Sequence, residues 1–238
     1  MKYSKILKNG KRSDMIKAVF MDVDNTLLDF NASAKKAMEM AFDINGLRFE
    51  ERYFYTFKKV NDGLWRKIET GELTRAGLHA VRFDLIFGEL GIDYDGKKVE
   101  SGFLDSLNVC AVPVEGAEDI LQYLSAKYLL CSASNAPCAQ QHRRLAVSGL
   151  KKYFRHMFIS EEIGFNKPDI RFFEACFKTV APITPGETAM IGDSLTADVA
   201  GGKACGAFTV WFNRLSEPAG GAEPDRTVKL LSEIKDIL

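Results

Sequence analysis

The chain has 238 residues, of which 46% are hydrophobic and 27% are charged, so it is long enough for one full core and a smaller second lobe. Its 32 basic and 32 acidic residues give a formal net charge of +0, and no basic field attracts nucleic acid or anionic lipid. No apolar stretch approaches the roughly 18 residues that a membrane-spanning helix needs. We therefore expect no nucleic acid polymer, no membrane and no obligate protein partner.

The basic first residues, MKYSKILKNGKRSDMIK, lack the apolar block and the small-residue cleavage site of a secretory signal. Residues 1–14 are predicted to be an extension before the first strand, with Met15 as an alternative start. The five cysteines are odd in number, and no two have the two-residue spacing of a zinc or redox pair. Reduced thiols in a cytoplasmic protein fit this pattern best.

Five short apolar runs are typical of buried β-strands, and each ends at a polar cluster. They cover residues 17–21, 128–133, 156–160, 188–191 and 208–212. Between them lie amphipathic segments, such as 115–126 and 169–180, whose apolar residues recur at helical spacing. Strands that alternate with helices predict an α/β fold whose parallel sheet is doubly wound, with helices on both faces.

The first run leads into Asp22-Val23-Asp24-Asn25-Thr26. Asp22 and Asp24 point to the same side of an extended chain, and such close carboxylates repel unless a cation or a shared proton relieves them. Oxygen ligands of this kind suit a hard cation such as Mg²⁺. The alternative is a loop of solvated aspartates, because Asp and Asn are common in turns.

From about residue 31 to residue 107 the periodicity is helical almost throughout. Gly46, Gly71 and Gly91 stand where helices would end. A helical lobe is therefore predicted to be inserted after the first strand. The predicted domains are the lobe at 31–109 and the core at 15–30 and 110–238.

One helix of the lobe is predicted over residues 74–90, with Thr74 as its N-cap. Its expected buried stripe consists of Leu78, Val81, Leu85 and Ile86. Arg82 interrupts that stripe, and a charge on a buried face is costly unless it is paired or used. We expect Arg82 to pair with a carboxylate of the lobe, and contact with a ligand is the alternative.

Two later clusters offer partners for an anion. The second run ends in Ser134-Asn135 ahead of a predicted helix, and such a helix start either binds an oxyanion or is simply capped. Lys167 precedes Pro168, which favours an extended backbone at Lys167 and a helix that starts at Pro168. The Lys167 ammonium is placed to neutralise an anion, unless it is an ordinary solvated lysine.

The fourth run leads into Gly192-Asp193, with Asp198 one turn into the helix that follows. Either acid alone is explained as a helix cap, but capping does not explain why strand ends from both halves of the chain carry acids. If the two strands are neighbours, Asp22, Asp24 and Asp193 converge on one cation.

Together these groups are the parts that phosphoryl transfer requires, namely positioning and charge neutralisation. No activated Ser, Cys or His lies in these clusters, so a carboxylate or a metal-bound water must be the nucleophile.

In order and spacing, four motifs resemble those of the haloacid dehalogenase-like (HAD) hydrolases: DVDNT, the strand that ends in Ser134-Asn135, GFNKPD, and GDSLTAD. The resemblance implies that Asp22 is the nucleophile and forms an aspartyl-phosphate, while Asp24 acts first as general acid and then as base. The other implied roles are Mg²⁺ binding by the Asp22 side chain, the Asp24 backbone carbonyl and Asp193, acidic support by Asp198, and phosphoryl binding by Ser134, Asn135 and Lys167. In this family the pair Gly201-Gly202 is unusually rich in glycine, and it is predicted to loosen its helix.

Asp24 separates the branches of the family. Dehalogenases and phosphonatases of the family lack an acid at this position, whereas phosphatases keep it because an alkoxide leaves poorly without a proton. The resemblance therefore implies a Mg²⁺-dependent phosphomonoester hydrolase that acts on a small phosphorylated metabolite. The alternatives are a sugar-phosphate phosphatase or phosphomutase, a haloacid dehalogenase, and a phospho-accepting signalling domain, which needs no inserted lobe.

The helical lobe looks like the helical cap of the family, which closes over the substrate and excludes water. Within it, the segments VNDGLW at 60–65 and GELT at 71–74 and the pair Arg82-Phe83 are similar to bacterial pyrimidine 5′-nucleotidases. This resemblance implies nucleoside 5′-monophosphates as substrates, with Arg82, Trp65 and Phe30 as candidate contacts. Trp65 and Phe30 either stack on a base or belong to the core of the lobe.

Overall fold

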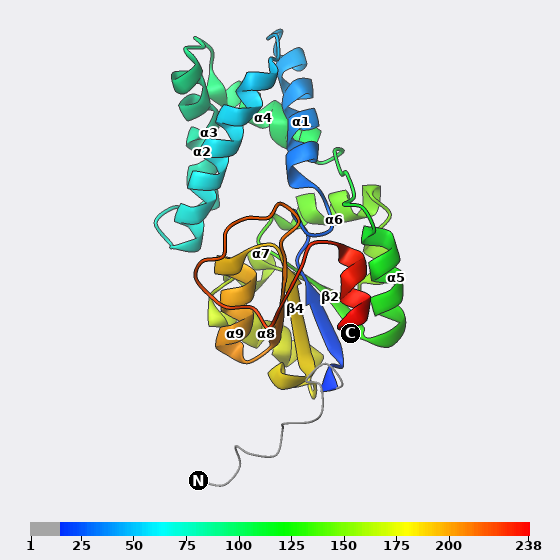
Figure 1. Ribbon diagram of the computed structural model, residues 1–238. Coiled ribbons are helices and arrows are strands. Elements are labelled where there is room, and N and C mark those ends of the chain that lie inside the picture. Colours follow the sequence, from blue (N-terminus) through cyan, green and yellow to red (C-terminus); the bar gives the residue numbers. More distant parts are fainter. Residues whose placement is uncertain (1–14) are drawn as a thin grey trace. The chain divides into compact units, whose positions relative to one another are not determined.

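Six parallel strands form one sheet in the computed structural model, which describes residues 15–238 (Figure 1). The strands are β1 (Ala18–Met21), β2 (Leu129–Ser134), β3 (His156–Ile159), β4 (Thr188–Gly192), β5 (Phe208–Phe212) and β6 (Arg226–Val228). Their order is β3-β2-β1-β4-β5-β6, so β1 pairs with β2 on one side and with β4 on the other. The predicted α/β fold class, a doubly wound parallel sheet, is confirmed.

Helices cover both faces of this sheet (Figure 1). Helix α5 (Ala117–Lys127) lies on one side, and α8 (Ile170–Val180) and α9 (Ala200–Cys205) lie on the other. Every residue of β1, β4 and β5 is buried, which explains why these strands are apolar throughout and show no alternation. Phe20, Phe173 and Met190 pack in one apolar cluster that joins the sheet to α8.

The chain divides into two compact units, a sheet unit up to Thr26 with Glu115–Asn135 and Tyr153–Leu238, and a helical unit of Leu27–Val114 with Ala136–Lys152. The helical unit contains α1 (Phe30–Ile44), α2 (Glu51–Glu69), α3 (Arg75–Leu90), α4 (Gly96–Leu107) and α6 (Cys138–Val147). The short helical segments of the chain are η2 (Lys151–Tyr153), α7 (Ser160–Ile163), η3 (Pro185–Glu187), η4 (Leu195–Val199) and η5 (Leu231–Asp236). The domain boundaries at residues 31 and 109 remain a prediction.

The helix ends of the helical unit follow from local chemistry. Gly46, Gly71 and Gly91 have φ angles of 68°, 77° and 66°, a conformation that glycine adopts without strain where a helix stops. Thr74 caps α3, because its hydroxyl accepts a hydrogen bond of 3.1 Å from the N–H of Gly77.

The predicted buried face of α3 is wrong at two positions. Val81 and Leu85 are 37% and 48% exposed. The buried residues of α3 are Leu78, Arg82, Phe83, Ile86 and Phe87. The face is rotated because the rings of Phe83 and Phe87 contact each other and Phe83 also contacts Phe57 and Phe103, and aromatic rings bury more area than Val or Leu.

Two smaller features of the sheet unit also differ from the sequence prediction. Strand β6 was not predicted, because it has only three residues and two of them are exposed. Helix α8 begins at Ile170 and not at Pro168, because the Asp169 side chain accepts a hydrogen bond of 2.9 Å from the N–H of Arg171 and so caps the helix.

None of the helices within residues 15–238 has the length and apolarity needed to cross a bilayer. All five cysteines are free thiols. Burial raises the pKa of the Cys131 thiol to about 12, so this side chain is a small uncharged core residue at neutral pH.

The glycine pair of α9 permits close packing, while its predicted loosening of the helix stays a prediction. Both glycines are buried. A Cβ at Gly201 would lie 2.3 Å from Cε2 of Phe173, and one at Gly202 would lie 2.8 Å from Cγ2 of Thr209. Helix α9 therefore approaches α8 and β5 more closely than any side chain would allow.

Gly201→Ala is expected to lower the free energy of unfolding by about 1–2 kcal/mol, because overpacking against the Phe173 ring outweighs the roughly 1 kcal/mol that alanine gains in a helix. Urea unfolding followed by circular dichroism measures this loss. Gly220→Ala is the matched control, since a Cβ there meets nothing within 4 Å. Equal stability of the two variants would contradict close packing at Gly201.

Candidate active site

The carboxyl ends of β1, β2 and β4 meet at one edge of the sheet. Asp22 directly follows β1, and its N–H donates a hydrogen bond of 2.9 Å to the carbonyl oxygen of Ile191 in β4. Asp193 directly follows β4, while Ser134 ends β2. Because β1 lies between β2 and β4, residues that are far apart in the chain are brought to one place.

Three carboxylates gather at this edge. Asp22, Asp193 and Asp198 each offer an oxygen, and these oxygens all lie within 4.8 Å of one another. The side chain of Asp24 lies outside this group and is half-buried. The family resemblance assigns a backbone carbonyl of Asp24 to the metal, and that assignment stays a prediction.

Lys167 is not a solvated lysine, because only 2% of its side chain is exposed. Its Nζ donates hydrogen bonds to Asp22 Oδ1 at 2.7 Å, to Asp198 Oδ1 at 2.6 Å and to the carbonyl oxygen of Ala133 at 2.5 Å. An ammonium has three N–H donors, so all of them are engaged. In this arrangement Lys167 fixes two carboxylates, and an anion that binds it must replace one of the three acceptors.

The charge of Lys167 is stabilised by the same contacts. Burial on its own lowers the pKa of an ammonium, but the Asp198 and Asp22 carboxylates outweigh burial and raise the pKa of Lys167 above its ordinary value. The lysine is therefore charged at neutral pH.

Asn135 places the backbone of Lys167. Its Nδ2 donates a hydrogen bond of 3.0 Å to the carbonyl oxygen of Lys167, and its Oδ1 accepts one of 2.8 Å from the N–H of Lys167. The Lys167–Pro168 peptide bond is cis. This link between the residue after β2 and the Lys167 loop is a supporting role for Asn135 that the sequence did not indicate. Its predicted contact with a phosphoryl group stays a prediction, as does that of the buried Ser134.

Asp198 is held from two sides. Its Oδ1 accepts from Lys167, and its Oδ2 accepts a hydrogen bond of 3.1 Å from the N–H of Ser194. The carboxylate packs directly over Gly192, where a Cβ would lie 2.1 Å from Oδ2. Glycine is therefore required at the end of β4 for Asp198 to reach the site.

Burial dominates the electrostatics of the cluster. It raises the pKa of Asp22 to about 7, the neighbouring Asp198 and Asp24 add to the rise, and Lys167 opposes it. Burial and then the charges of Asp22 and Asp198 raise the pKa of Asp193 well above its usual range. Asp22 and Asp193 are therefore costly to ionise unless a further cation is nearby.

The donor set fits a divalent cation. When Asp22, Asp193 and Asp198 are ionised, their three negative charges exceed the one positive charge of Lys167 by two. Carboxylate oxygens are the ligands that Mg²⁺ prefers in proteins. Asp22 and Asp193 are the side chains best able to bind it, because both oxygens of Asp198 already accept hydrogen bonds.

The predicted contacts of the lobe lie in the helical unit. Arg82 is 2% exposed and its guanidinium is engaged within that unit. Its Nη2 and Nε donate to the two oxygens of Glu100 at 2.6 Å and 3.0 Å, and its Nη1 donates to Asn61 Oδ1 at 3.0 Å. His79 also contacts Glu100, at 2.8 Å from Nδ1 to Oε1. Arg82 thus has the carboxylate partner expected of a buried arginine.

The two aromatic candidates both have packing contacts. Trp65 packs against the apolar cluster of Leu64, Ile68 and Leu78. Phe30 packs against the large apolar cluster of the helical unit, and Cζ of Arg144 lies 5.8 Å from the centroid of its ring. Stacking of either ring on a base stays a prediction.

Arg82→Met is expected to lower the free energy of unfolding by about 3–5 kcal/mol, because it leaves the Glu100 carboxylate buried without its guanidinium partner. Urea unfolding followed by circular dichroism measures the loss. The double variant with Arg82→Met and Glu100→Gln removes the stranded charge and is expected to recover part of it. A loss below about 1 kcal/mol in the single variant would show that the pair is not important for stability.

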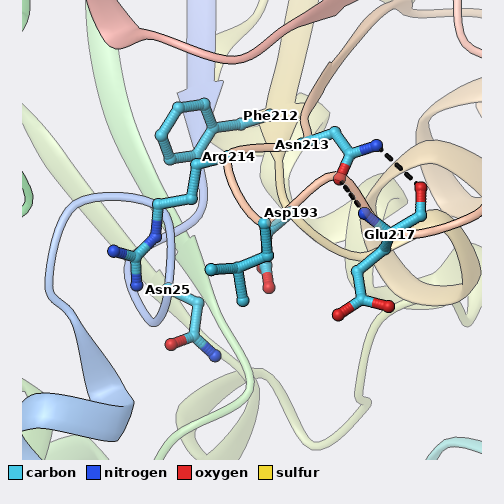
Figure 2. A pocket seen from close by; sticks show the side chains of 7 residues that line it. Asn25, Asp193, Phe212, Asn213, Arg214 and Glu217 are labelled. Atoms are coloured by element: carbon cyan, nitrogen blue, oxygen red, sulfur yellow. Dashed lines mark hydrogen bonds between the residues drawn. The ribbon is translucent and has the colours of Figure 1, made fainter.

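One group of site residues is absent from the sequence prediction. A pocket lies beside Asp193 (Figure 2). It is lined by Asn25, Asp193, Phe212, Asn213, Arg214, Leu215 and Glu217. Asn213 and Arg214 follow β5 as the acids follow β1 and β4, and that position after an apolar run was the signal available in the sequence.

Comparison with known proteins agrees with this geometry. Residues 16–206 match the family model of the haloacid dehalogenase-like hydrolases. The pyrimidine 5′-nucleotidase PynA of Streptococcus pneumoniae is 35% identical over 198 residues, which are 83% of this chain and 84% of PynA. The glyceraldehyde 3-phosphate phosphatase of Methanopyrus kandleri is 25% identical over 204 residues, 84% of this chain and 85% of that protein.

A further relative has a crystal structure. The HAD-hydrolase YfnB of Bacillus subtilis is 32% identical over 223 residues, which are 93% of this chain and 95% of YfnB. The structure of its orthorhombic form, bound to magnesium, matches this chain with a TM-score of 0.89 at 31% identity and covers 93% of this chain and 98% of YfnB.

Proposed function

The chain belongs to the haloacid dehalogenase-like hydrolases, and from this premise we propose that it is a Mg²⁺-dependent phosphatase of small phosphorylated metabolites. Nucleoside 5′-monophosphates are the proposed substrate class. The observation that carries the proposal is the buried cluster in which Lys167 links Asp22 and Asp198 next to Asp193. None of the five cysteines forms a disulfide, which supports a reducing, cytoplasmic compartment for this activity.

In the proposed reaction Asp22 attacks the phosphorus atom. Lys167 holds its Oδ1, and residues 15–238 give no hydrogen bond to its Oδ2, so this oxygen is available for attack. The phosphoester bond breaks as a bond to Asp22 forms, and Asp24 gives a proton to the departing alkoxide. Asp24 then takes a proton from the water that hydrolyses the aspartyl-phosphate. A bound Mg²⁺ supplies charge neutralisation for the phosphoryl oxygens.

The choice of substrate class rests on similarity within the family. PynA, a pyrimidine 5′-nucleotidase, shares 35% identity over most of both chains. The similarity to a glyceraldehyde 3-phosphate phosphatase, at 25% identity, supports a sugar-phosphate phosphatase as the second candidate. Asp24 favours a phosphatase over a dehalogenase, because expulsion of a halide needs no acid at this position.

A phosphate-release screen with Mg²⁺ tests the proposal across nucleoside 5′-monophosphates and sugar phosphates. We expect release to be fastest from pyrimidine nucleotides, to stop with EDTA and to return with added Mg²⁺. Faster release from sugar phosphates would support the second candidate, and an isomerised sugar phosphate seen by NMR would indicate a phosphomutase. Absence of release from every phosphomonoester would overturn the proposed function.

A further inference from the structure

We propose that Arg214 is a specificity-determining residue and that the pocket beside Asp193 binds hydroxyl groups of the sugar in the substrate. This inference rests on the proposed function, because it assigns the pocket to the leaving group of a sugar-bearing phosphomonoester. The lining residues all belong to the sheet unit, so the pocket is complete within it.

The pocket continues directly from the carboxylate cluster. Asp193 lines the pocket, and its carboxylate lies within 4.8 Å of those of Asp22 and Asp198. Figure 2 shows the Arg214 guanidinium and the Asn25 amide in the same pocket, with the Asp193 carboxylate between them and Glu217. A group esterified to a phosphoryl group at Asp22 therefore has the pocket within reach.

The charges of the lining favour a neutral polar ligand over a second anion. The pocket has one cation, Arg214, and two carboxylates, Asp193 and Glu217. If the divalent ion of the proposed function takes up the charge of Asp193, Arg214 and Glu217 balance each other. A sugar hydroxyl both donates and accepts, so it can accept from the guanidinium and donate to an amide or carboxylate oxygen. Phe212 and Leu215 add an apolar wall for the carbon atoms of the ring.

Asn25 provides an independent indication of a ligand. Its Oδ1 is buried and accepts no hydrogen bond from any residue between 15 and 238. A buried acceptor in this state is unfavourable, because it has given up hydrogen bonds to water and gained none in the fold. A small rotation of the Asn25 amide towards a hydroxyl in the pocket would therefore gain a hydrogen bond without breaking one.

The loop that carries Arg214 is braced. Asn213 donates from Nδ2 to the carbonyl oxygen of Glu217 at 2.9 Å, and its Oδ1 accepts from the N–H of Glu217 at 2.8 Å. Trp211 donates from Nε1 to the carbonyl oxygen of Asp193 at 2.8 Å, which ties the end of β5 to the end of β4. These contacts fix the backbone of the loop on which Arg214 stands.

Arg214→Ala tests the inference with a series of uridine 5′-monophosphates that carry two, one or no ribose hydroxyls, and with p-nitrophenyl phosphate, which has no sugar. We expect the ratio of kcat/KM for the ribonucleotide to kcat/KM for p-nitrophenyl phosphate to fall about tenfold in Arg214→Ala. In the wild-type protein kcat/KM is expected to fall as ribose hydroxyls are removed. In Arg214→Ala the differences in kcat/KM among the three uridine nucleotides are expected to become smaller. Arg226→Ala, which removes an exposed arginine of β6, is the matched control and should keep the wild-type ratio.

An equal loss on every substrate would overturn the inference, because it would place Arg214 on the phosphoryl group or in the fold. Equal values of kcat/KM for the wild-type protein on all three uridine nucleotides would also overturn it.

Titration calorimetry with uridine 5′-monophosphate separates the inference from the proposed function. In the Asp22→Asn background, adding Arg214→Ala is expected to weaken binding about tenfold. If binding weakens in this way but the wild-type protein releases no phosphate, the role of the pocket is supported and the proposed phosphatase activity is rejected. If the affinity is unchanged, the role of the pocket is rejected.

Discussion

Asp22→Asn is expected to lower kcat for phosphate release by about 10⁴-fold or more, because an amide is not a nucleophile. The variant keeps the size of the side chain, and the amide oxygen can still accept from Lys167. The fold should therefore persist. Steady-state phosphate release measures the activity, and circular dichroism with thermal melting checks the fold.

A second variant, Asp24→Asn, distinguishes the covalent route from direct attack by water. Asp24→Asn is expected to lose most of the activity while retaining Asp22, so mass spectrometry after exposure to substrate should detect a phosphoryl group on the protein. Asp236→Asn changes an exposed aspartate of η5 and serves as the control, with activity within twofold of the wild type. If Asp22→Asn keeps more than about a tenth of the activity, the covalent route is wrong.

Lys167→Met is expected to lower kcat/KM by about 10³-fold, because the site loses the cation that joins Asp22 to Asp198. Methionine has a similar length, so the loss reports on charge more than on volume. The pKa of Asp22 is already about 7 with Lys167 opposing the rise, and it should be higher without the lysine. Since Asp22 must be ionised to attack, the acidic limb of the pH–rate profile should move to higher pH.

The raised pKa of Asp22 should also make the free energy of unfolding depend on pH. A carboxyl whose pKa is higher in the folded than in the unfolded protein loses stability as pH rises from its unfolded value through its folded value. Lys167→Met is therefore expected to be more destabilised, relative to the wild type, at pH 8 than at pH 5 in urea unfolding. Lys203→Met, which breaks an exposed ion pair of 2.9 Å with Asp225, is the control and should lose less than about 1 kcal/mol. An unshifted pH profile in Lys167→Met would contradict the proposed contact between Lys167 and the nucleophile.

Much of the fold could be predicted because its signals are local. Strands buried on both faces appear as unbroken apolar runs, and helix ends appear as glycine or as a capping side chain such as Thr74. Strand β6 gave no such signal, because two of its three residues are exposed. The buried face of α3 was misread because Phe57 and Phe103, which belong to other helices, decide how Phe83 packs.

The site was predictable to the extent that it depends on strand ends. Asp22 stands at the first position after an apolar run and Asp193 at the second, and the strand-end rule finds both without a structure. The hydrogen bonds that organise the site join residues far apart in the chain, such as Asn135 and Lys167 at a separation of 32 residues. No local pattern encodes such a pair. Arg214 obeys the strand-end rule as well, but a basic residue there does not suggest a ligand until the pocket is seen.

The position of β1 in the sheet determines when that strand can become ordered during translation. Residues 18–21 leave the ribosome before their partners, which are residues 129–132 and 188–191. At about 5–20 residues per second, the first partner follows on the order of 5–20 seconds later, and the second follows later still. Helices α1 to α4 are synthesised in the meantime and can fold on the nascent chain through contacts of their own. The strand that precedes Asp22 therefore has no partner until residues 129–132 have been made, and its second edge stays open until residues 188–191 follow.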